Sequence, residues 1–482
     1  MTVSPPAAKA LEAKFQQIWG YSRFRPPQGE IVQALLAGQD LLVVMPTGGG
    51  KSICFQLPAL LQTGVTLVVS PLVALMENQV QELCDRSLPA ALLHSELSRT
   101  DRRQTLQALS QNRLRLLYLS PETLLSPAVW QQLCQPQVKI NGLVLDEAHC
   151  LTQWGDSFRP AYRRLGAVRP ALLKAKPAGT KIAIAAFTAT ADPHTQQTLL
   201  QVLQLQQPRV IRLNPYRANL HLRMQTVWTP RGRRQALLKF LQNHPNQPGL
   251  VYARTRRDTE NLAQVLSRQG YSVQAYHAGL APPPRRQIES DWLSGRCQFV
   301  VCTSAFGMGI NKPDCRWVVH FQLPSLLAEY VQEVGRSGRD GAPAQALSLV
   351  SEPTGLLDPA DQQRWRFFAQ KAQQQARQAQ QLARQLPRQG TLATVRQQHP
   401  QAEQALALLH RSGQLSWLDP FTYRLQPAIA TKSQPTPSAT AVMQKYLRSR
   451  QCRWKSLLEQ FGFRREAEEM RCGKCDRCTA KP

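Results

Sequence analysis

The sequence predicts an α/β protein with two similar domains, each built on a parallel sheet flanked by helices. From residue 30 to 350, short apolar runs alternate with amphipathic segments. The runs are dense in Val, Ile and Leu without strict alternation, which is typical of parallel strands buried on both faces. They form two sets of five, divided near 206–225. The expected strands cover residues 41–45, 66–70, 114–119, 142–146, 182–187, 249–252, 272–276, 298–302, 317–321 and 345–350.

The chain is long enough for several domains and strongly basic. Its 482 residues exceed what one hydrophobic core usually organises. Lys and Arg number 59 against 31 Asp and Glu, and the net charge of +28 favours a polyanionic partner, nucleic acid or an anionic membrane. The N-terminal residues contain no apolar signal region, and no run approaches the ~18 apolar residues of a spanning helix. We therefore expect a cytoplasmic protein with reduced thiols.

The composition changes after residue 355, where the chain is predicted to be mainly helical. Residues 361–387 are expected to form one long helix with one buried stripe. Residues 391–425 indicate two short helices and then two short strands, the order of a winged-helix-like module. The polar tract 431–440 would link this module to the last segment. The residues of the expected stripe are Trp365, Phe368, Ala372, Ala376, Ala379, Leu382 and Leu386.

These patterns divide the chain into four expected domains. The segment 204–223 is expected to be a linker between the two α/β domains. The four domains are a first α/β domain at 1–206, a second α/β domain at 207–352, a helical and winged-helix-like insert at 353–430, and a C-terminal segment at 440–482.

The stretch "LLVVMPTGGGKS", residues 41–52, has the features of a phosphate-binding loop between a strand and a helix. The glycines at 48–50 allow close backbone approach, and the N–H groups of a helix start point at phosphate oxygens. Lys51 would reach the β- and γ-phosphates of ATP, and Ser52 would bind Mg²⁺. The usual spacing of this motif places a glycine where this chain has Met45.

A second motif supports a nucleotide site. The stretch "GLVLDEAHC", residues 142–150, is an apolar strand that ends in two adjacent carboxylates. Asp146 at the strand end would hold Mg²⁺. Glu147 would orient and deprotonate the water that attacks the γ-phosphate.

Four of the 11 cysteines form a separate cluster. Cys472, Cys475 and Cys478 have the spacing C-x-x-C-x-x-C, and Cys452 lies upstream of them. Four thiolates suit tetrahedral Zn²⁺, and the same set is compatible with an iron–sulfur cluster. Residues 440–482 carry eleven Lys or Arg against five Asp or Glu, so this segment is also expected to contact phosphates.

The order of the motifs resembles the RecQ family of superfamily 2 DNA helicases. The resemblance covers residues 10–350 and, less fully, 440–478. In that family the loop commonly reads T-G-G-G-K-S, without the first glycine, so Met45 is in keeping with it. The motifs are "GYSRFRPPQ" (20–28), "TGGGKS" (47–52), "SPLVALMENQV" (70–80), "LLYLSPETLL" (116–125), "DEAHC" (146–150), "LTQWGDSFRPAY" (151–162), "FTATA" (187–191), "AYHAGL" (275–280), "AFGMGINKPD" (305–314) and "QEVGRSGRDG" (332–341).

The resemblance implies how ATP is bound. Gln28 would read the adenine edge through its amide, Arg25 would assist, and Tyr21 would stack on the base. The expected phosphate and magnesium ligands are Thr47, Gly48, Gly49, Gly50, Lys51, Ser52 and Asp146. In the second domain, Arg336 and Arg339 are expected to share one helix face. Arg339 would be the arginine finger, with Arg336 and Gln332 in support.

The resemblance also assigns residues 151–162 to an aromatic-rich loop that links DNA binding to ATP hydrolysis. Aromatic side chains stack on bases at roughly 1–3 kcal/mol each without sequence preference. The expected DNA-binding and coupling residues are His149, Trp154, Phe158 and Arg159. For the four cysteines, the resemblance selects zinc in a structural role.

Together these features predict an ATP-dependent DNA helicase with two RecA-like domains. The resemblance alone implies movement from 3′ to 5′ and action in DNA repair and recombination. The expected cofactors are ATP, Mg²⁺ and Zn²⁺. The expected partners are single-stranded and tailed duplex DNA, single-strand-binding or recombination proteins, and no membrane. We expect a monomer in the cytoplasm, at the nucleoid.

Three alternatives remain at this point: an RNA helicase, a DNA translocase without strong unwinding, and a non-catalytic binding module. Two departures from the family pattern bear on them. The winged-helix-like module precedes the zinc segment, and "MENQ" at 76–79 lacks a lysine often found there.

Overall fold

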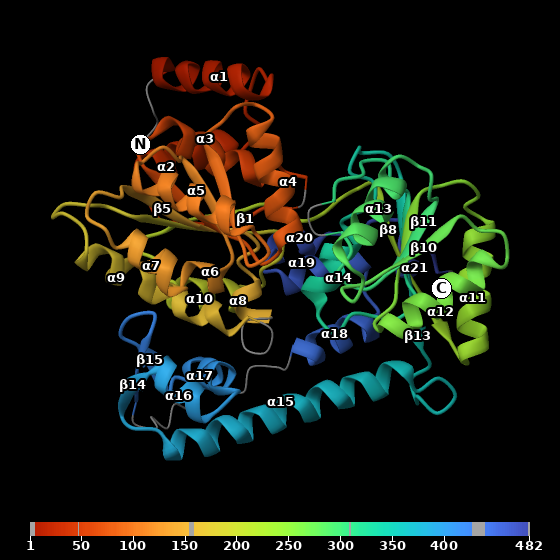
Figure 1. Ribbon diagram of the computed structural model, residues 1–482. Helices are drawn as coiled ribbons and strands as arrows, with labels where there is room; N and C mark the ends of the chain where they lie inside the picture. The colour runs from red at the N-terminus through yellow and green to blue at the C-terminus, as the bar shows by residue number, and fades with distance from the viewer. Residues whose placement is uncertain (1–4, 47, 154–158, 308–309, 427–438, 481–482) are drawn as a thin grey trace. The chain divides into compact units, whose positions relative to one another are not determined.

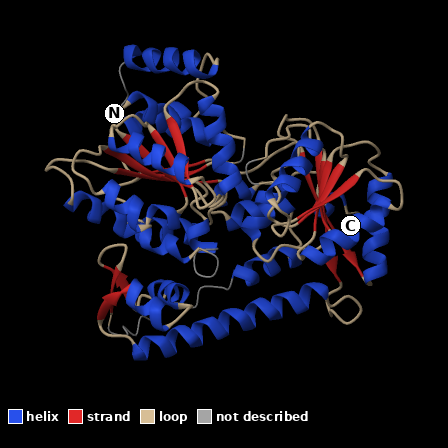
Figure 2. Ribbon diagram, in the orientation of Figure 1, coloured by secondary structure: helices blue, strands red, loops and turns tan. Residues whose placement is uncertain are grey.

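The computed structural model describes residues 5–46, 48–153, 159–307, 310–426 and 439–480. The chain divides into two compact units, and each unit combines two separate stretches of sequence. Unit 1 contains Met1–Leu213 and Gln374–Lys432, and unit 2 contains Asn214–Gln373 and Ser433–Pro482. In each unit, helices flank a parallel sheet (Figures 1 and 2). The expected pair of parallel-sheet α/β domains is therefore confirmed.

The sheet of unit 1 is seven-stranded and parallel throughout. Its order is β3-β4-β2-β5-β6-β1-β7, so β6 lies between β5 and β1. All residues of β1, β2 and β6 are buried, because helices cover both faces. The strands are β1 (Leu41–Val44), β2 (Val65–Val69), β3 (Ala90–Leu93), β4 (Leu116–Leu119), β5 (Ile140–Leu145), β6 (Ala183–Thr188) and β7 (Arg209–Arg212).

The helices of unit 1 form two layers. One layer packs on the sheet face that carries Leu41, Val43 and Val68 and consists of α2 (Gln28–Leu36), α3 (Lys51–Leu61) and α4 (Val73–Cys84). The N-terminal helix α1 (Pro5–Trp19) packs through Phe15 on Val32 and Leu57. The opposite layer consists of α5 (Arg99–Ser110), α6 (Pro121–Leu124), α7 (Pro127–Leu133), α8 (Cys150–Gln153), the 3₁₀ helix η1 (Pro160–Ala167), α9 (Val168–Lys174) and α10 (Pro193–Val202).

The sheet of unit 2 is six-stranded and also parallel, in the order β10-β11-β9-β12-β13-β8. Helices α11 (Pro230–Gln242) and α12 (Arg256–Ser267) cover one face. Helices α13 (Pro282–Leu293) and α14 (Leu327–Val334) pack on the other. The strands are β8 (Leu220–Val227), β9 (Gly249–Tyr252), β10 (Val273–Tyr276), β11 (Phe299–Cys302), β12 (Trp317–His320) and β13 (Ala344–Ser351).

The long helix α15 (Ala360–Gln385) begins in unit 2 and ends in unit 1. There it leads into a small module with its own hydrophobic core, which includes Leu406 and Tyr423. Together with the end of α15, the helix–strand–helix–helix–strand–strand order is that of a winged helix. The module consists of β14 (Gln389–Thr391), α16 (Leu392–Gln398), α17 (Ala402–Arg411), β15 (Leu415–Trp417) and β16 (Thr422–Leu425), with its sheet ordered β14-β16-β15.

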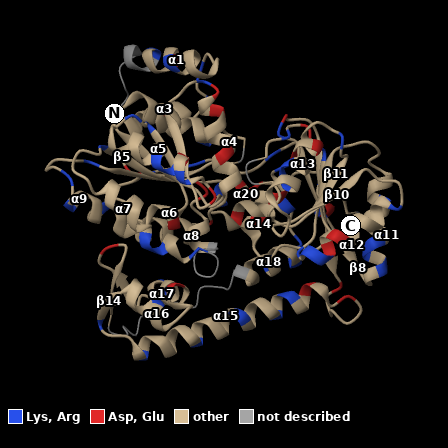
Figure 3. Cartoon of the chain, viewed as in Figure 1, with Lys and Arg blue, Asp and Glu red and all other residues tan. Residues whose placement is uncertain are grey.

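The C-terminal segment packs on the sheet of unit 2. Trp454 donates from Nε1 to the carbonyl of Leu220 over 3.1 Å, and its ring belongs to the same core as Tyr330 and Tyr446. Its elements are α18 (Ala439–Arg448), α19 (Arg453–Gln460), α20 (Arg464–Glu468) and α21 (Asp476–Thr479). Basic positions occur in both units and are not gathered in a single segment (Figure 3).

All ten expected strands are present, but two other expectations were wrong. The expected linker at 204–223 forms β7 and the first half of β8. The expected stripe of α15 is buried at Ala379 and Leu382, whereas Phe368 is 44% exposed, because the middle of the helix packs on neither core. No described helix is both long and apolar enough to cross a bilayer.

Candidate nucleotide site and cysteine cluster

The glycine-rich loop connects β1 to α3 in unit 1. Gly48 and Gly50 have φ of +84° and +77°, a region that side chains rarely adopt, and Gly50 is the N-cap of α3. The helix begins at Lys51, so its first N–H groups face the loop. Ser52 lies in the first turn of α3. Thr47 lies outside the described residues.

Met45 packs against the glycine-rich loop. The residue is 1% exposed, ends the buried stretch that β1 begins, and packs with Phe55 and Phe187. A Cβ on Gly49 would lie 2.7 Å from Met45 Cγ, so the methionine side chain occupies the space beside the glycine. A side chain at position 49 would therefore collide with the buried Met45, which favours glycine there.

Lys51, Glu147 and His149 form the centre of the site. Lys51 Nζ lies 3.6 Å from Glu147 Oε1, and His149 Nδ1 lies 3.2 Å from Glu147 Oε2. His149 is also 3.0 Å from the hydroxyl of Thr188, at the end of β6. Glu147 has φ of +49°, an uncommon backbone conformation that is often found at functional sites. Apart from this ion pair, Lys51 Nζ has no hydrogen-bond partner among the described residues, so its N–H groups are available to donate to a phosphate.

Asp146 lies beside this centre at the end of β5. Gln79 Nε2 donates to its Oδ2 over 3.4 Å, and the N–H of Glu147 donates to its Oδ1 over 3.0 Å. Burial, reinforced by the charge of Glu147 and opposed by Lys51, raises the pKa of Asp146 to about 6. A carboxylate that is costly to ionise in isolation is well suited to a divalent cation, which stabilises its charged form. Ser52 and Asp146 therefore remain the residues proposed to hold Mg²⁺.

The three residues assigned to adenine lie at the start of α2 and just before it. Gln28 is 4% exposed; its Oε1 accepts from the N–H of Arg25 over 2.9 Å, and its Nε2 donates to the carbonyl of Gly49 over 3.0 Å. Gln28 is thus tied to the phosphate loop itself. Tyr21 is 53% exposed, with its ring 5.6 Å from that of Phe15, so a face of the tyrosine is open for stacking.

The residues assigned to phosphate in unit 2 follow α14. The expectation that Arg336 and Arg339 share a helix face was wrong, because α14 ends at Val334 and both arginines lie in the turns after it. They are held by one preceding loop instead. Arg336 Nη1 donates to the carbonyl of Gly307, and Arg339 Nη1 donates to the carbonyl of Ile310 over 3.2 Å.

Arg339 lies in the field of Arg336, and this changes its pKa. Burial, reinforced by the neighbouring charge of Arg336, lowers the pKa of Arg339 to about 10. The guanidinium still carries its charge at neutral pH, and a nearby anion would relieve the repulsion between the two arginines. Gln332 is 6% exposed on α14.

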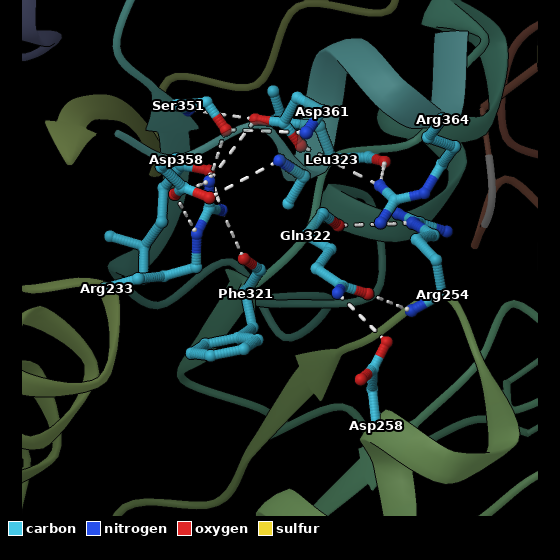
Figure 4. A network of polar contacts seen from close by, with 12 residues as sticks. Arg233, Arg254, Asp258, Phe321, Gln322, Leu323, Ser351, Asp358, Asp361 and Arg364 are labelled. Atoms are coloured by element: carbon cyan, nitrogen blue, oxygen red, sulfur yellow. Dashed lines mark hydrogen bonds and ion pairs between the residues drawn. The ribbon is translucent and has the colours of Figure 1, made fainter. Parts of the chain in front are cut away.

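A buried ion network at the start of this motif was not found from the sequence. Glu333 accepts two hydrogen bonds from Arg254, over 2.8 and 2.7 Å, and a third contact of 2.9 Å joins it to His320 Nε2. Although burial opposes it, Arg254 and His320 lower the pKa of Glu333 to about 2. Arg254 also donates to the carbonyl of Gln322 (Figure 4). The network fixes α14 to the carboxyl ends of β9 and β12.

The coupling residues are described only in part. His149 is placed as above, and Arg159 donates to Glu122 Oε2 over 2.6 Å. Trp154 and Phe158 lie outside the described residues. Sequence reasoning missed Gln79 and Thr188 as individual site residues, although both belong to quoted motifs, "SPLVALMENQV" and "FTATA".

The four cysteines meet in unit 2. The Sγ atoms of Cys452, Cys472, Cys475 and Cys478 all lie within 4.8 Å of one another. Tetrahedral zinc with Zn–S bonds of about 2.3 Å requires sulfur separations of about 3.8 Å, and the Cys472–Cys478 separation is 3.9 Å. Backbone N–H groups lie 3.4 Å from Sγ of Cys452 and of Cys475, which would support thiolates. The donor set therefore fits zinc.

Comparison with known proteins agrees with this geometry. A family model described as DEAD/DEAH box helicase matches residues 25–199, and one described as helicase conserved C-terminal domain matches residues 232–341. The chain is 53% identical over 472 residues to the ATP-dependent DNA helicase RecQ of Synechocystis sp., with 98% of each chain covered. The chain belongs to the RecQ family.

Other RecQ-family relatives match a smaller part of their own length. ATP-dependent DNA helicase RecQ of Pasteurella multocida is 40% identical over 336 residues, which are 70% of this chain and 51% of the relative. Probable ATP-dependent DNA helicase RecS of Bacillus subtilis is 39% identical, with 70% of this chain and 66% of the relative covered. The family resemblance stated from the motifs is thus confirmed.

Solved structures support the fold. A structure of Mycobacterium smegmatis helicase Lhr bound to ssDNA and AMP-PNP aligns with a TM-score of 0.55 and 22% identity, covering 72% of this chain and 48% of that one. S. cerevisiae Dbp5 bound to RNA and ADP BeF3 aligns with a TM-score of 0.57 and 17% identity, covering 73% and 88%. At these identities the likeness concerns the fold alone.

Proposed function

We propose that this RecQ-family chain is an ATP-dependent DNA helicase that couples ATP hydrolysis to movement along single-stranded DNA and to unwinding of tailed duplexes. The observation that carries the proposal is the Lys51–Glu147–His149 centre between the glycine-rich loop and the ends of β5 and β6. The net charge of +28 supports a nucleic-acid substrate. Polarity from 3′ to 5′, action in repair and recombination, and work as a monomer at the cytoplasmic nucleoid rest on the family.

The residues take the following proposed roles in hydrolysis. Lys51 and the loop N–H groups bind the β- and γ-phosphates, and Glu147 orients water and accepts its proton. Ser52 and Asp146 would hold Mg²⁺, which supplies neutralisation of phosphate charge when bound. His149 positions Glu147 through Nδ1, the atom that also contacts the hydroxyl of Thr188.

The second domain and the adenine residues complete the proposal. Arg339 is the proposed arginine finger, with Arg336 and Gln332 in support. Tyr21, Arg25 and Gln28 are proposed to bind adenine. One N–H of Gln28 Nε2 donates to the carbonyl of Gly49, and the second N–H of the amide is the proposed donor to adenine.

The cysteine cluster is proposed to hold a structural zinc ion. A four-thiolate site leaves no open ligand position for catalysis, and a metal at this place would stabilise the segment that packs on β8.

DNA-stimulated ATP hydrolysis tests the proposal directly. Lys51→Ala should lower the stimulated rate at least about 100-fold, because a preorganised phosphate donor is lost. Glu147→Gln should lower kcat by about 10²–10⁴-fold while ATP binding persists. Matched controls are Lys174→Ala and Glu82→Gln, whose side chains are exposed in the same unit. Wild-type hydrolysis without any response to DNA, or an unchanged rate in Lys51→Ala, would contradict the mechanism.

The kind of nucleic acid that stimulates ATP hydrolysis, and whether it is unwound, distinguishes a DNA helicase from an RNA helicase or a translocase. The same assay with single-stranded DNA and single-stranded RNA of equal length separates a DNA enzyme from an RNA helicase. Strand displacement on duplexes with a 3′ or a 5′ tail then tests unwinding and polarity. Stimulated hydrolysis without displacement of either duplex would identify a translocase that does not unwind.

A further inference from the structure

The winged-helix-like module packs on the first helicase domain, although the chain enters it from the second. Both the module and residues 1–213 belong to unit 1, and α17 lies against η1. Phe421, next to β16, meets Trp130 of α7 edge to face with ring centroids 5.4 Å apart. Phe421 also packs against the core that lies under that face of the sheet. The module is thus seated on the helicase domain through apolar contact.

Arg164 of η1 is the polar centre of this contact. It is 5% exposed, and its Nη2 forms an ion pair with Glu403 of α17. Its Nη1 donates to the carbonyl of Pro420 over 3.1 Å, and its guanidinium lies 6.0 Å from the centre of the Trp417 ring. A buried charge needs such partners, so loss of either side of the pair leaves an uncompensated ion. Every one of these partners belongs to the module.

Arg163 of η1 and His410 of α17 interact electrostatically beside this ion pair. Arg163 is 4% exposed, and burial together with its charge lowers the pKa of His410 to about 4. His410 is therefore neutral at physiological pH and adds no repulsion to the two arginines.

The other side of η1 packs against α8, the helix that directly follows His149. Ala161, Tyr162 and Leu165 are fully buried in one core with Ala148, Cys150 and Leu151. Cys150 starts α8 and directly follows His149. η1 is eight residues long, whereas 3₁₀ helices longer than about three or four residues are uncommon because their hydrogen bonds are poorer. A shift of η1 would therefore displace His149 and Glu147.

We propose that Arg164 is a positioning residue of the ATPase: the module, by holding Arg164 through Glu403, sets η1 and α8 and thereby the geometry of Glu147 and His149 in the DNA-stimulated state. This inference rests on the DNA-stimulated ATPase proposed above. The module acts here on the hydrolytic step from a distance, without touching ATP.

Steady-state ATPase assays of the full chain with an oligo-dT 30-mer test the proposal. Arg164→Met and Glu403→Gln should each lower the DNA-stimulated kcat by about 5- to 150-fold, the usual range of coupling between sites. The rate without DNA, the KM for ATP and the oligo-dT concentration for half-maximal stimulation should stay within about 2-fold of wild type. The Arg164→Met/Glu403→Met double variant should be no slower than Arg164→Met, because both changes remove one interaction.

Arg384→Met, an exposed arginine at the end of α15, is the matched control and should behave as wild type. A higher half-maximal oligo-dT concentration at unchanged kcat would make the contact a DNA-binding feature and overturn the proposal. Equal losses of basal and stimulated rates would indicate general damage and also overturn it. Normal stimulation in Arg164→Met refutes this inference alone, whereas an unstimulated wild type refutes the proposed function.

Discussion

The start of α15 is fixed to unit 2 by a buried arginine, and this makes a sharp prediction about stability. Arg233 of α11 is 3% exposed, and all of its donors are used inside the protein (Figure 4). Nε and Nη2 donate to Asp358 Oδ2 over 2.9 and 2.7 Å. The remaining bonds go to Ser351 Oγ at 2.8 Å and to the carbonyls of Phe321 and Leu349 at 2.6 and 2.8 Å.

Arg233→Met retains most of the apolar stem and removes every donor. Asp358, which is 1% exposed, is then a buried carboxylate without its counter-ion. Removing one partner of a buried pair costs about 3–5 kcal/mol. For a unit of roughly 200 residues, in which 1 kcal/mol shifts the melting temperature by about 2–4 °C, the transition of unit 2 should fall by about 6–20 °C.

Scanning calorimetry of the full chain measures this shift, with the exposed neighbour Arg234→Met as the control. Asp358→Asn keeps an oxygen acceptor and loses the charge, so its melting temperature should lie between those of the other two variants. If Arg233→Met melts within about 2 °C of Arg234→Met, the reasoning from buried charge is refuted.

Two further predictions concern pH and metal. The pKa of Glu333 is about 2 in the folded protein against 4.5 for a free glutamate. The ion network should therefore raise the free energy of unfolding by about 3 kcal/mol above pH ~4.5, and this contribution should be lost as the pH falls towards 2. The difference in free energy of unfolding between wild type and Glu333→Gln, followed in urea from pH 7 to 3, should shrink accordingly; a constant difference would contradict the low pKa. Elemental analysis should find about one zinc per chain, which Cys475→Ser loses and Cys84→Ser keeps. Iron with visible absorbance would overturn the choice of zinc.

The strands that the sequence did not predict are all at sheet edges, and the three-residue β14 is one edge of the small third sheet. β3 and β7 are the two edges of the first sheet, and β8 is one edge of the second. The edge strands β7 and β8 lack the dense apolar run that revealed the central strands, because β7 buries one residue of four and β8 three of eight. β3 is apolar but only four residues long. The central strands and the motifs at their ends were predictable because burial on both faces and phosphate chemistry restrict the residue types locally.

The parts of the site that escaped prediction depend on residues far apart in the chain. Arg164 and Glu403 are separated by 239 positions, and Arg254 and Glu333 by 79. A single sequence shows that each residue is charged, and most charged residues are solvated, so nothing local marks these four as buried partners. The turn that carries Arg339 was mistaken for a helix for a related reason: a spacing of three residues suits a helix face, yet Gly335 ends α14 here.

The route of the chain through its two units also constrains synthesis. The polypeptide passes from unit 1 to unit 2, back to unit 1 and again to unit 2. A ribosome adds about 5–20 residues per second, so both sheets have emerged for several seconds before their last partners appear. Until then the surface around Trp130 lacks Phe421, and the carbonyl of Leu220 lacks the indole of Trp454. A nascent chain that stops after residue 352 would carry every helicase motif and still expose two unfinished apolar faces, which chaperones would be expected to bind.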